Sequence, residues 1–279
     1  MKIIKKLGGL ILSLMLVLGL TACGNNSGDE MSEEKKSFTI GCMPLNEPGV
    51  QAIADMMKEK GYEVEVKVFD GNNLPAMALK DGEIDSLMLN HLPWINTFNE
   101  ENNSELVLVE PFKYASLLGI YSSKHDSLDQ IPDGGTITVS NDPSNMERAL
   151  QFLEKLDFIK LGEKTGDFYT VLDVKENKKN LKFLEVETTS TAASYKDTDA
   201  TIAFTSVMKN AGIDPFSYLE QDDLYVNYPT GLVVKKGDED SEWAKAVMEV
   251  TATEQYSKKF NEIFGGAYVL FSEMENIKQ

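Results

Sequence analysis

The chain has 279 residues, with 45 acidic side chains against 27 basic ones and a formal net charge of −18. A surface this negative repels nucleic acids and anionic lipid headgroups, so we expect no binding to DNA or RNA. Arg148 is the single arginine among the 27 basic residues, which makes its surroundings informative.

The first 22 residues have the features of a bacterial lipoprotein signal peptide. Three lysines precede an apolar run from Leu7 to Leu20, which is too short to span a membrane comfortably. Leu20-Thr-Ala-Cys23 follows, the pattern at which such lipoproteins are cleaved and their new N-terminal cysteine is lipidated. We expect Cys23 to anchor the mature protein outside the cytoplasm, on the bacterial cell membrane. An ordinary signal peptide with an incidental cysteine is the alternative.

Cleavage there would remove three lysines and no acidic residue, so the net charge would become −21. Cys42 would be the one thiol left after lipidation, which excludes an intrachain disulfide. It ends a predicted strand, and we favour a small buried hydrophobic role over a catalytic nucleophile because no histidine is near it in the sequence.

Residues 23–36 predict a lipidated, charged spacer between the lipid and the fold. Next come a strand at 37–43, an amphipathic helix ending at Lys60-Gly61, an alternating strand at 63–69, a short helix between Pro75 and Gly82, and a strand at 84–89. Strands that alternate with helices at this spacing predict a mostly parallel α/β sheet.

A second α/β alternation is predicted further along the chain. Its strands are expected at 136–140, 181–187 and 200–204, a strand at 230–236 returns to the first unit, and the last forty residues are expected to be helical. We infer a two-lobed α/β fold, with 37–118 plus 231–279 in lobe I and 119–230 in lobe II. Crossings near 115–122 and 228–234 would form a hinge on which the lobes close over a ligand.

The segment from Ser140 to Leu150 carries the single arginine. A helix is expected from Ser144, with Ser144-x-x-Glu147 as its capping box. Arg148 is expected opposite the apolar stripe of this helix and outside the core. A guanidinium beside helix N–H groups and the amides of Asn141 and Asn145 suits recognition of a small carboxylate. A solvated surface arginine is the alternative.

Three other groups of residues lie at the end of predicted strands or just after them. They are Cys42-Met43, Gly71-Asn72-Asn73, and Asn90-His91 with Trp94. Ligands of such sheets bind outside the carboxyl ends of the strands, so we expect these groups and the arginine segment to meet at one site.

Catalytic and metal-binding patterns are missing from the sequence. It has two histidines, no close His/Cys/Asp metal spacing and no nucleophile elbow. Paired acids such as Asp222-Asp223 are expected in solvated turns or at helix N-termini rather than as catalytic carboxylates. We therefore predict a protein that is not an enzyme and has no cofactor or metal.

Several motifs resemble the NlpA lipoprotein family, the methionine-binding lipoproteins of bacterial ABC importers. They are the lipobox at Cys23, Asp81-Gly-Glu-Ile-Asp85, Asn90-His-Leu-Pro-Trp94, Asp126-Ser-Leu-Asp-Gln-Ile-Pro-Asp-Gly134, Asn141-Asp-Pro-Ser-Asn-Met-Glu-Arg-Ala-Leu150, Asn180-Leu-Lys-Phe-Leu-Glu185 and Gly231-Leu-Val-Val-Lys-Lys-Gly-Asp238. The resemblance runs in the same order from 38 to 271. It implies a type II periplasmic-binding-protein fold that delivers methionine, or a methionine-containing dipeptide, to a membrane permease with a cytoplasmic ATPase.

The resemblance also implies roles for two residues, Arg148 on the ligand carboxylate and His91 as a further ligand contact. Other family positions differ in this chain. Gly71-Asn72 stands where relatives usually have Asp-Tyr, and Phe204 stands where they have an asparagine that holds the ligand, with Thr205 or Ser206 as a shorter substitute.

From these observations we expect a pocket for a small amino acid or short peptide, with Arg148 as its carboxylate anchor. Further hydrogen bonds are expected from His91, Asn90 and Asn145. The remaining candidates are Trp94, Met43 and Tyr114 around an apolar ligand side chain, together with Asn141 and Thr205. Core packing is the alternative for Trp94 and Met43, and a local turn amide for Asn90. The alternative function is a surface lipoprotein with a different ligand or an adhesin or receptor role.

Overall fold

The computed structural model describes residues 35–111 and 114–274. The predicted signal peptide, Cys23 and most of the predicted spacer lie outside the described residues. Among the helices of these two ranges, none combines the length and the apolar character that a membrane crossing requires.

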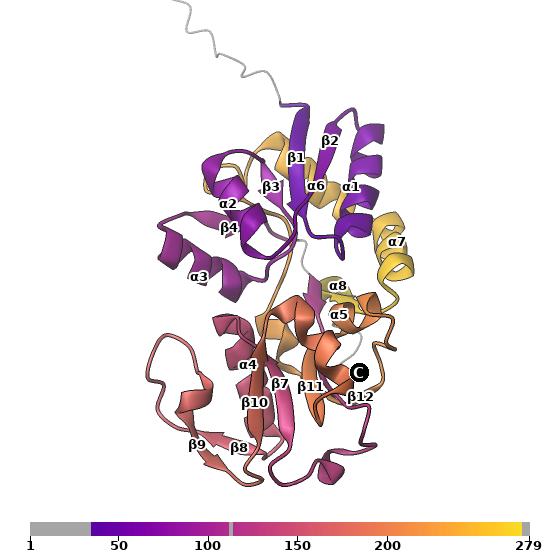
Figure 1. Cartoon of the computed structure of the whole chain (residues 1–279). Helices are drawn as coiled ribbons and strands as arrows, with labels where there is room; N and C mark the ends of the chain where they lie inside the picture. The colour runs from indigo at the N-terminus through magenta and orange to yellow at the C-terminus, as the bar shows by residue number, and fades with distance from the viewer. Residues whose placement is uncertain (1–34, 112–113, 275–279) are drawn as a thin grey trace, which may run out of the picture. The chain divides into compact units, whose positions relative to one another are not determined.

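Two five-stranded mixed sheets, one in each lobe, form the framework (Figure 1). The first lobe contains β1 (Ser37–Cys42), α1 (Glu47–Glu59), β2 (Glu63–Val68), α2 (Asn73–Asp81), β3 (Ser86–Leu87), α3 (Leu92–Asn102), β4 (Leu106–Leu108), β13 (Val233–Lys235), α6 (Glu242–Thr251) and α7 (Glu254–Phe264). The second contains β6 (Leu118–Tyr121), β7 (Thr136–Ser140), α4 (Pro143–Lys155), β8 (Ile159–Leu161), β9 (Val174–Asn177), β10 (Lys182–Val186), β11 (Ala200–Phe204), α5 (Thr205–Asn210) and β12 (Tyr218–Gln221). Short 3-10 helices lie at η1 (Leu128–Gln130), η2 (Val171–Asp173), η3 (Thr188–Lys196) and η4 (Leu224–Asn227).

The strand orders are β2-β1-β3-β13-β4 in the first sheet and β10-β7-β11-β6-β12 in the second. In the first sheet, β1 pairs in parallel with β2 and β3. In the second sheet, β7 pairs in parallel with β10 and β11. One strand of each sheet runs antiparallel to both of its neighbours: β13 in the first sheet and β6 in the second. The predicted two-lobed α/β fold is therefore confirmed, with two mixed sheets in each of which one strand runs against the other four.

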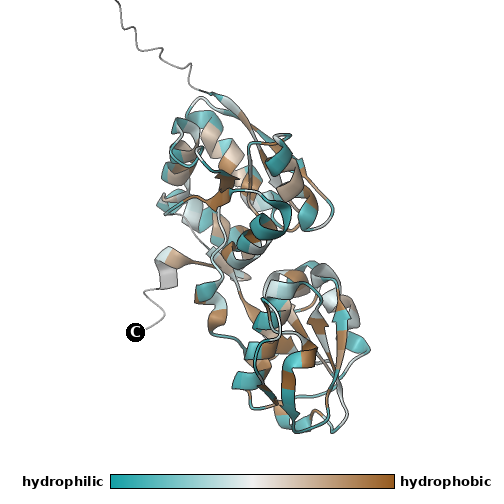
Figure 2. Cartoon of the chain, turned by 90° about the vertical axis from the view of Figure 1, so that its left-hand side faces the viewer, coloured by the Kyte–Doolittle hydropathy of each residue, from teal (hydrophilic) through white to brown (hydrophobic). Residues whose placement is uncertain are grey.

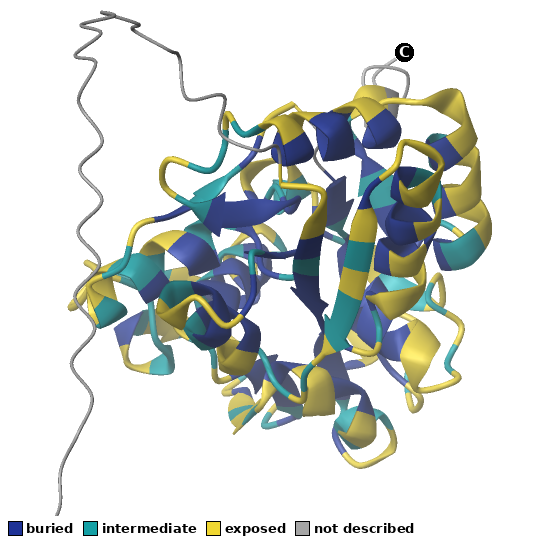
Figure 3. Cartoon of the chain, turned by 90° about the horizontal axis from the view of Figure 1, so that it is seen from above, coloured by how far each residue is buried: buried dark blue, intermediate teal, exposed yellow. Residues whose placement is uncertain are grey.

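Hydrophobic residues (brown in Figure 2) and buried residues (dark blue in Figure 3) lie on the inner faces of the helices and on the central strands. In α1, Val50, Ile53 and Met57 recur at helical spacing and are buried against β1. Cys42, at the end of β1, belongs to this core, and burial raises the pKa of its thiol to about 12. Its surroundings therefore fit the predicted role of a small buried hydrophobic residue.

The sequence suggested that the last forty residues are helical, but the structure places a strand among them. After α7 ends at Gly265 and Gly266, both with positive φ, the strand β14 (Tyr268–Leu270) pairs antiparallel with β5 (Tyr114–Ser116), and α8 (Phe271–Met274) follows. The two glycines accept the left-handed backbone that stops the helix. Tyr268 then buries its ring between Phe264 and Tyr114, which stabilises the strand.

Two chain segments near the expected crossings are hydrogen-bonded to each other. The N–H of Tyr114 donates to the carbonyl of Thr230 at 2.9 Å, and the N–H of Thr230 donates to the carbonyl of Tyr114 at 2.7 Å. This pair ties together the connections between the two sheets, as a hinge requires. The residue boundaries expected for the lobes stay a prediction.

Candidate ligand-binding site

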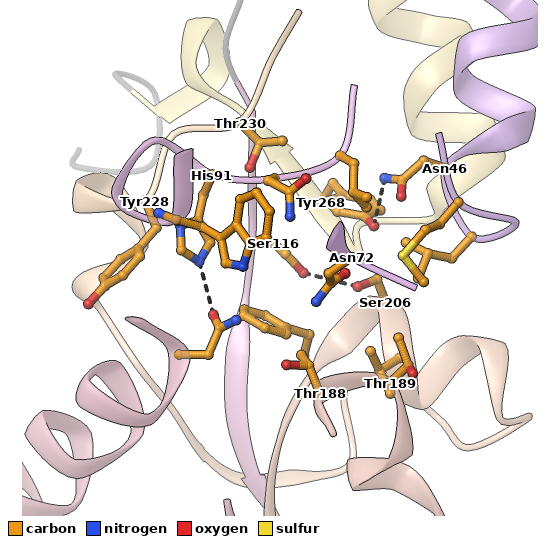
Figure 4. A pocket seen from close by; sticks show the side chains of 18 of the residues that line it. Asn46, Asn72, His91, Ser116, Thr188, Thr189, Ser206, Tyr228, Thr230 and Tyr268 are labelled. Atoms are coloured by element: carbon orange, nitrogen blue, oxygen red, sulfur yellow. Dashed lines mark hydrogen bonds between the residues drawn. The ribbon is translucent and has the colours of Figure 1, made fainter. Parts of the chain in front are cut away.

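A cavity of about 600 Å³, counting the part open to solvent, is lined by residues from both lobes (Figure 4). Many of the lining residues follow the carboxyl ends of strands. The lining consists of Met43, Leu45, Asn46, Asn72, Leu89, Asn90, His91, Trp94, Ser116, Asn145, Arg148, Thr188, Thr189, Phe204, Ser206, Val207, Tyr228, Thr230 and Tyr268.

Arg148 lies on α4 and is only 1% exposed. Its Nε donates to Oδ2 of Asp222 at 2.7 Å, and its Nη2 donates to Oδ1 of Asp222 at 2.9 Å and to the carbonyl of Ser116 at 3.2 Å. The expectations that Arg148 lies outside the core and that Asp222 lies in a solvated turn were wrong. A buried guanidinium needs a paired carboxylate, and Asp222, in the loop after β12, supplies it. Its neighbour Asp223 is exposed and pairs with Lys155 instead.

Two aromatic rings hold the guanidinium of Arg148 in place. The ring of Tyr228 lies 4.5 Å from its central carbon and the ring of Phe204 lies 5.4 Å away. No acceptor among the described residues takes the N–H groups of Nη1. The arginine is thus fixed by the protein while its Nη1 donors remain available at the cavity wall.

Asn145 lies one turn before Arg148 on α4, and His91 sets the direction of its amide. The backbone N–H of Trp94 donates to Nδ1 of His91 at 3.2 Å, so the proton of the neutral imidazole is on Nε2. Nε2 therefore donates to Oδ1 of Asn145, 2.9 Å away (Figure 4). The Nδ2 donors of Asn145 have no acceptor among the described residues. Burial lowers the pKa of His91 to about 4, although the hydrogen bond to Asn145 opposes the shift.

Asp142, rather than Ser144, is the N-cap of α4. Pro143 is the first helical residue, and Oδ1 of Asp142 accepts the N–H of Asn145 at 3.0 Å. Glu147, expected to complete a capping box, instead accepts the N–H of Tyr169. Oδ2 of Asp142 also accepts Nε1–H of Trp94 at 2.8 Å, which joins α3 of the first lobe to α4 of the second.

A polar wall of the cavity combines side chains from distant parts of the chain. The hydroxyls of Ser116 and Ser206 are 3.1 Å apart, and Nδ2 of Asn46 donates to the hydroxyl of Tyr268 at 3.2 Å. Oδ1 of Asn46 and Oδ1 of Asn90 are buried without a hydrogen-bond partner among the described residues. These two oxygens are acceptors that a bound molecule could use.

Comparison with known proteins identifies the family. The NlpA lipoprotein model matches residues 38–271. The chain belongs to the NlpA lipoprotein family. A methionine-binding lipoprotein, MetQ, from Bacillus subtilis is 32% identical over 94% of this chain and 97% of its own length. The structure of an ABC transporter periplasmic substrate-binding protein from Coxiella burnetii is 26% identical and superposes with a TM-score of 0.77 over 83% of this chain and 99% of that one. The lipoprotein Tp32 from Treponema pallidum, 25% identical, gives 0.79 over 85% and 100%.

This NlpA family lipoprotein is therefore a substrate-binding protein of an ABC transporter and not an enzyme. The family resemblance inferred from the motifs is confirmed. Among residues 35–111 and 114–274, no group of three or more His, Cys, Asp and Glu side chains is arranged to hold a metal ion.

Six of the nine ligand-site candidates line the cavity of the NlpA family lipoprotein, and three do not. Those that line it are Met43, Asn90, His91, Trp94, Asn145 and Arg148. Asn141 is exposed, because the chain turns away into Asp142 and Pro143 before α4 begins. Tyr114 packs in the core against Phe260 and Tyr268.

Thr205 is fully buried, and its hydroxyl donates to the carbonyls of Leu117 and Ala267 at 3.2 and 2.6 Å. Its hydroxyl is therefore engaged with backbone carbonyls, whereas the neighbouring Ser206 lines the cavity. Asn46, Ser116, Tyr228 and Tyr268 were missed as lining residues. A turn after β1 and a β14 strand that the sequence did not predict bring in Asn46 and Tyr268.

Proposed function

We propose that this lipoprotein binds a small zwitterionic amino acid, methionine or a relative, or a short peptide, and delivers it to its ABC permease. The similarity to the methionine-binding lipoprotein of Bacillus subtilis supports methionine. Lipidation at Cys23 would hold the protein on the outside of the membrane, within reach of the permease and its cytoplasmic ATPase.

The observation that carries the proposal is a pair of donors on one face of α4. Asn145 and Arg148 are three residues apart, so their side chains lie on neighbouring turns of the same face. Nδ2 of Asn145 and Nη1 of Arg148 both lack protein acceptors among the described residues, and both residues line the cavity. Two such donors suit the two oxygens of a ligand carboxylate.

The charge of the cavity favours a zwitterion over a simple anion. Of the described residues that line it, Arg148 alone carries a formal charge, and Asp222 neutralises that charge from behind. A ligand with one carboxylate and one ammonium group leaves the site neutral, whereas an anion would add an uncompensated buried charge. Oδ1 of Asn46 provides a buried acceptor for the ammonium group.

An apolar section of the lining would hold the ligand side chain. It consists of Met43, Leu45, Leu89, Trp94 and Val207. A thioether or aliphatic chain gains about 0.8 kcal/mol for each CH₂ that it buries there. The bonds from His91 to Asn145 and from Trp94 to Asp142 join the lobes beside this cavity, so they would help to hold the protein closed over its ligand.

The test compares two variants that make the same chemical change. Asn145→Asp replaces the free Nδ2 donors by an anionic oxygen while keeping an acceptor for His91. Asn141→Asp makes the same change at an exposed position outside the cavity. In isothermal titration of the soluble form, residues 24–279, we expect L-methionine to bind wild type and Asn141→Asp equally and Asn145→Asp at least about tenfold more weakly. Equal binding by all three proteins would rule out this carboxylate site, and the absence of binding to any small solute would favour the surface-lipoprotein alternative.

A further inference from the structure

Asn90 is a buried amide with no protein partner in the described chain. It is 6% exposed and lines the cavity. Its Oδ1 is buried without a donor, whereas its Nδ2, which is not one of the buried unpaired atoms, donates to no described residue. A buried carbonyl oxygen that is left unpaired destabilises the protein that carries it, so its presence requires an explanation.

No structural role accounts for this amide. The N-cap of α3 is the next residue, His91, whose own side chain accepts the N–H of Trp94. Asn99, by contrast, donates to the carbonyl of Leu106 at 2.8 Å and accepts its N–H at 2.9 Å. The chain thus pairs both ends of Asn99 and neither end of Asn90.

Only some ligand groups would satisfy both ends of such an amide. An ammonium group pairs with Oδ1 and leaves Nδ2 without an acceptor, and a carboxylate does the reverse. A thioether pairs with neither atom. An amide of the ligand accepts from Nδ2 through its carbonyl and donates its N–H to Oδ1.

We propose that Asn90 makes the site selective for a small carboxylate that also carries an amide, through paired hydrogen bonds between the two amides. The proposal rests on the proposed function, because Asn145 and Arg148 take the carboxylate. Asn90 is adjacent to His91, whose Nε2 is 2.9 Å from Asn145, so the two subsites are within reach of one small molecule. The amide is either a side-chain carboxamide, as in glutamine, or a peptide bond.

The experiment uses L-methionine and L-glutamine, which have side chains of equal length, and glycyl-L-alanine as the peptide. Titration of the soluble form should show at least one amide ligand binding about tenfold or more tightly than L-methionine. Tighter binding of glutamine would assign the carboxamide, and tighter binding of the dipeptide would assign the peptide bond. Methionine binding that equals or exceeds both would overturn the proposal.

Asn90→Leu has a similar size and no hydrogen-bonding groups, and Asn141→Leu is the exposed control. We expect Asn90→Leu to abolish the preference for the amide ligand and to raise the melting temperature of the ligand-free protein, because it removes an unpaired buried amide. A retained preference, or a lowered melting temperature with no change in preference, contradicts the role of Asn90. If methionine binds in an Asn145-dependent way without any preference for amides, the proposed function stands and this inference fails. If none of the three ligands binds, both fail.

Discussion

Replacing Asp222 tests whether the paired carboxylate is what makes the burial of Arg148 possible. Asp222→Asn keeps the size of the side chain but leaves the guanidinium without a counter-charge. Both partners are essentially inaccessible to solvent, with side-chain exposures of 1% for Arg148 and 0% for Asp222, and two hydrogen bonds of 2.7 and 2.9 Å join them.

The expected loss follows from this geometry. Removing one member of a buried ion pair costs about 3–5 kcal/mol of unfolding free energy, because the other charge stays desolvated. The neighbouring Asp223 provides the matched control, since its pair with Lys155 is exposed, with side-chain exposures of 63% and 53%. Asp223→Asn should therefore cost less than about 1 kcal/mol.

Urea denaturation of both variants measures the difference directly. The double variant Arg148→Met with Asp222→Leu should recover most of the lost stability, because neither charge remains buried, yet it should not bind the ligand. If Asp222→Asn and Asp223→Asn cost the same, or if the double variant still binds ligand normally, the account of Arg148 as a carboxylate-supported anchor is refuted.

Three further predictions concern His91, Thr205 and Cys42. The pKa of His91 is about 4 in the folded protein and about 6.5 when unfolded, so the unfolded chain binds more protons between these pH values. The free energy of unfolding should therefore fall by about 2–3 kcal/mol as the pH drops from 6.5 to 4. In melts recorded across this pH range, His91→Gln should show a weaker dependence on pH. Thr205→Val should cost about 1–3 kcal/mol in urea melts, because the carbonyl of Ala267 loses its hydroxyl donor while that of Leu117 still accepts the backbone N–H of Thr205; ligand affinity should stay unchanged. The Cys42 thiol, fully buried and with its pKa raised to about 12, should react with a thiol reagent at pH 8 only after unfolding; rapid labelling of the native protein would contradict its burial.

Residues of the candidate site could be predicted from the sequence because their position depends on the ends of strands. Met43, Asn90 and Asn145 each follow a strand that local patterns predicted, and parallel strands bring such ends to one edge of a sheet. Local periodicity was also sufficient for the alternation of strands and helices in both lobes.

Contacts between distant residues could not be predicted in this way. Arg148 is buried because of Asp222, which lies 74 residues further along the chain, and nothing in the helix around Arg148 indicates that partner. The pairing of β14 with β5 depends on two glycines and on an aromatic ring that packs only in the folded protein. Thr205 was assigned to the pocket from its place in the family motif, whereas its hydroxyl is used to hold backbone carbonyls.

The central claim, that two donors of α4 bind the carboxylate of a small amino acid, is tested most directly from the side of the ligand. L-Methioninol keeps the ammonium group and the side chain of L-methionine but has a neutral CH₂OH in place of the carboxylate. In titrations of the soluble wild-type chain, we expect L-methionine to bind and L-methioninol to bind at least about a hundredfold more weakly. Equal affinity for the two compounds would contradict the claim, because it would mean that Arg148 and Asn145 do not recognise the carboxylate.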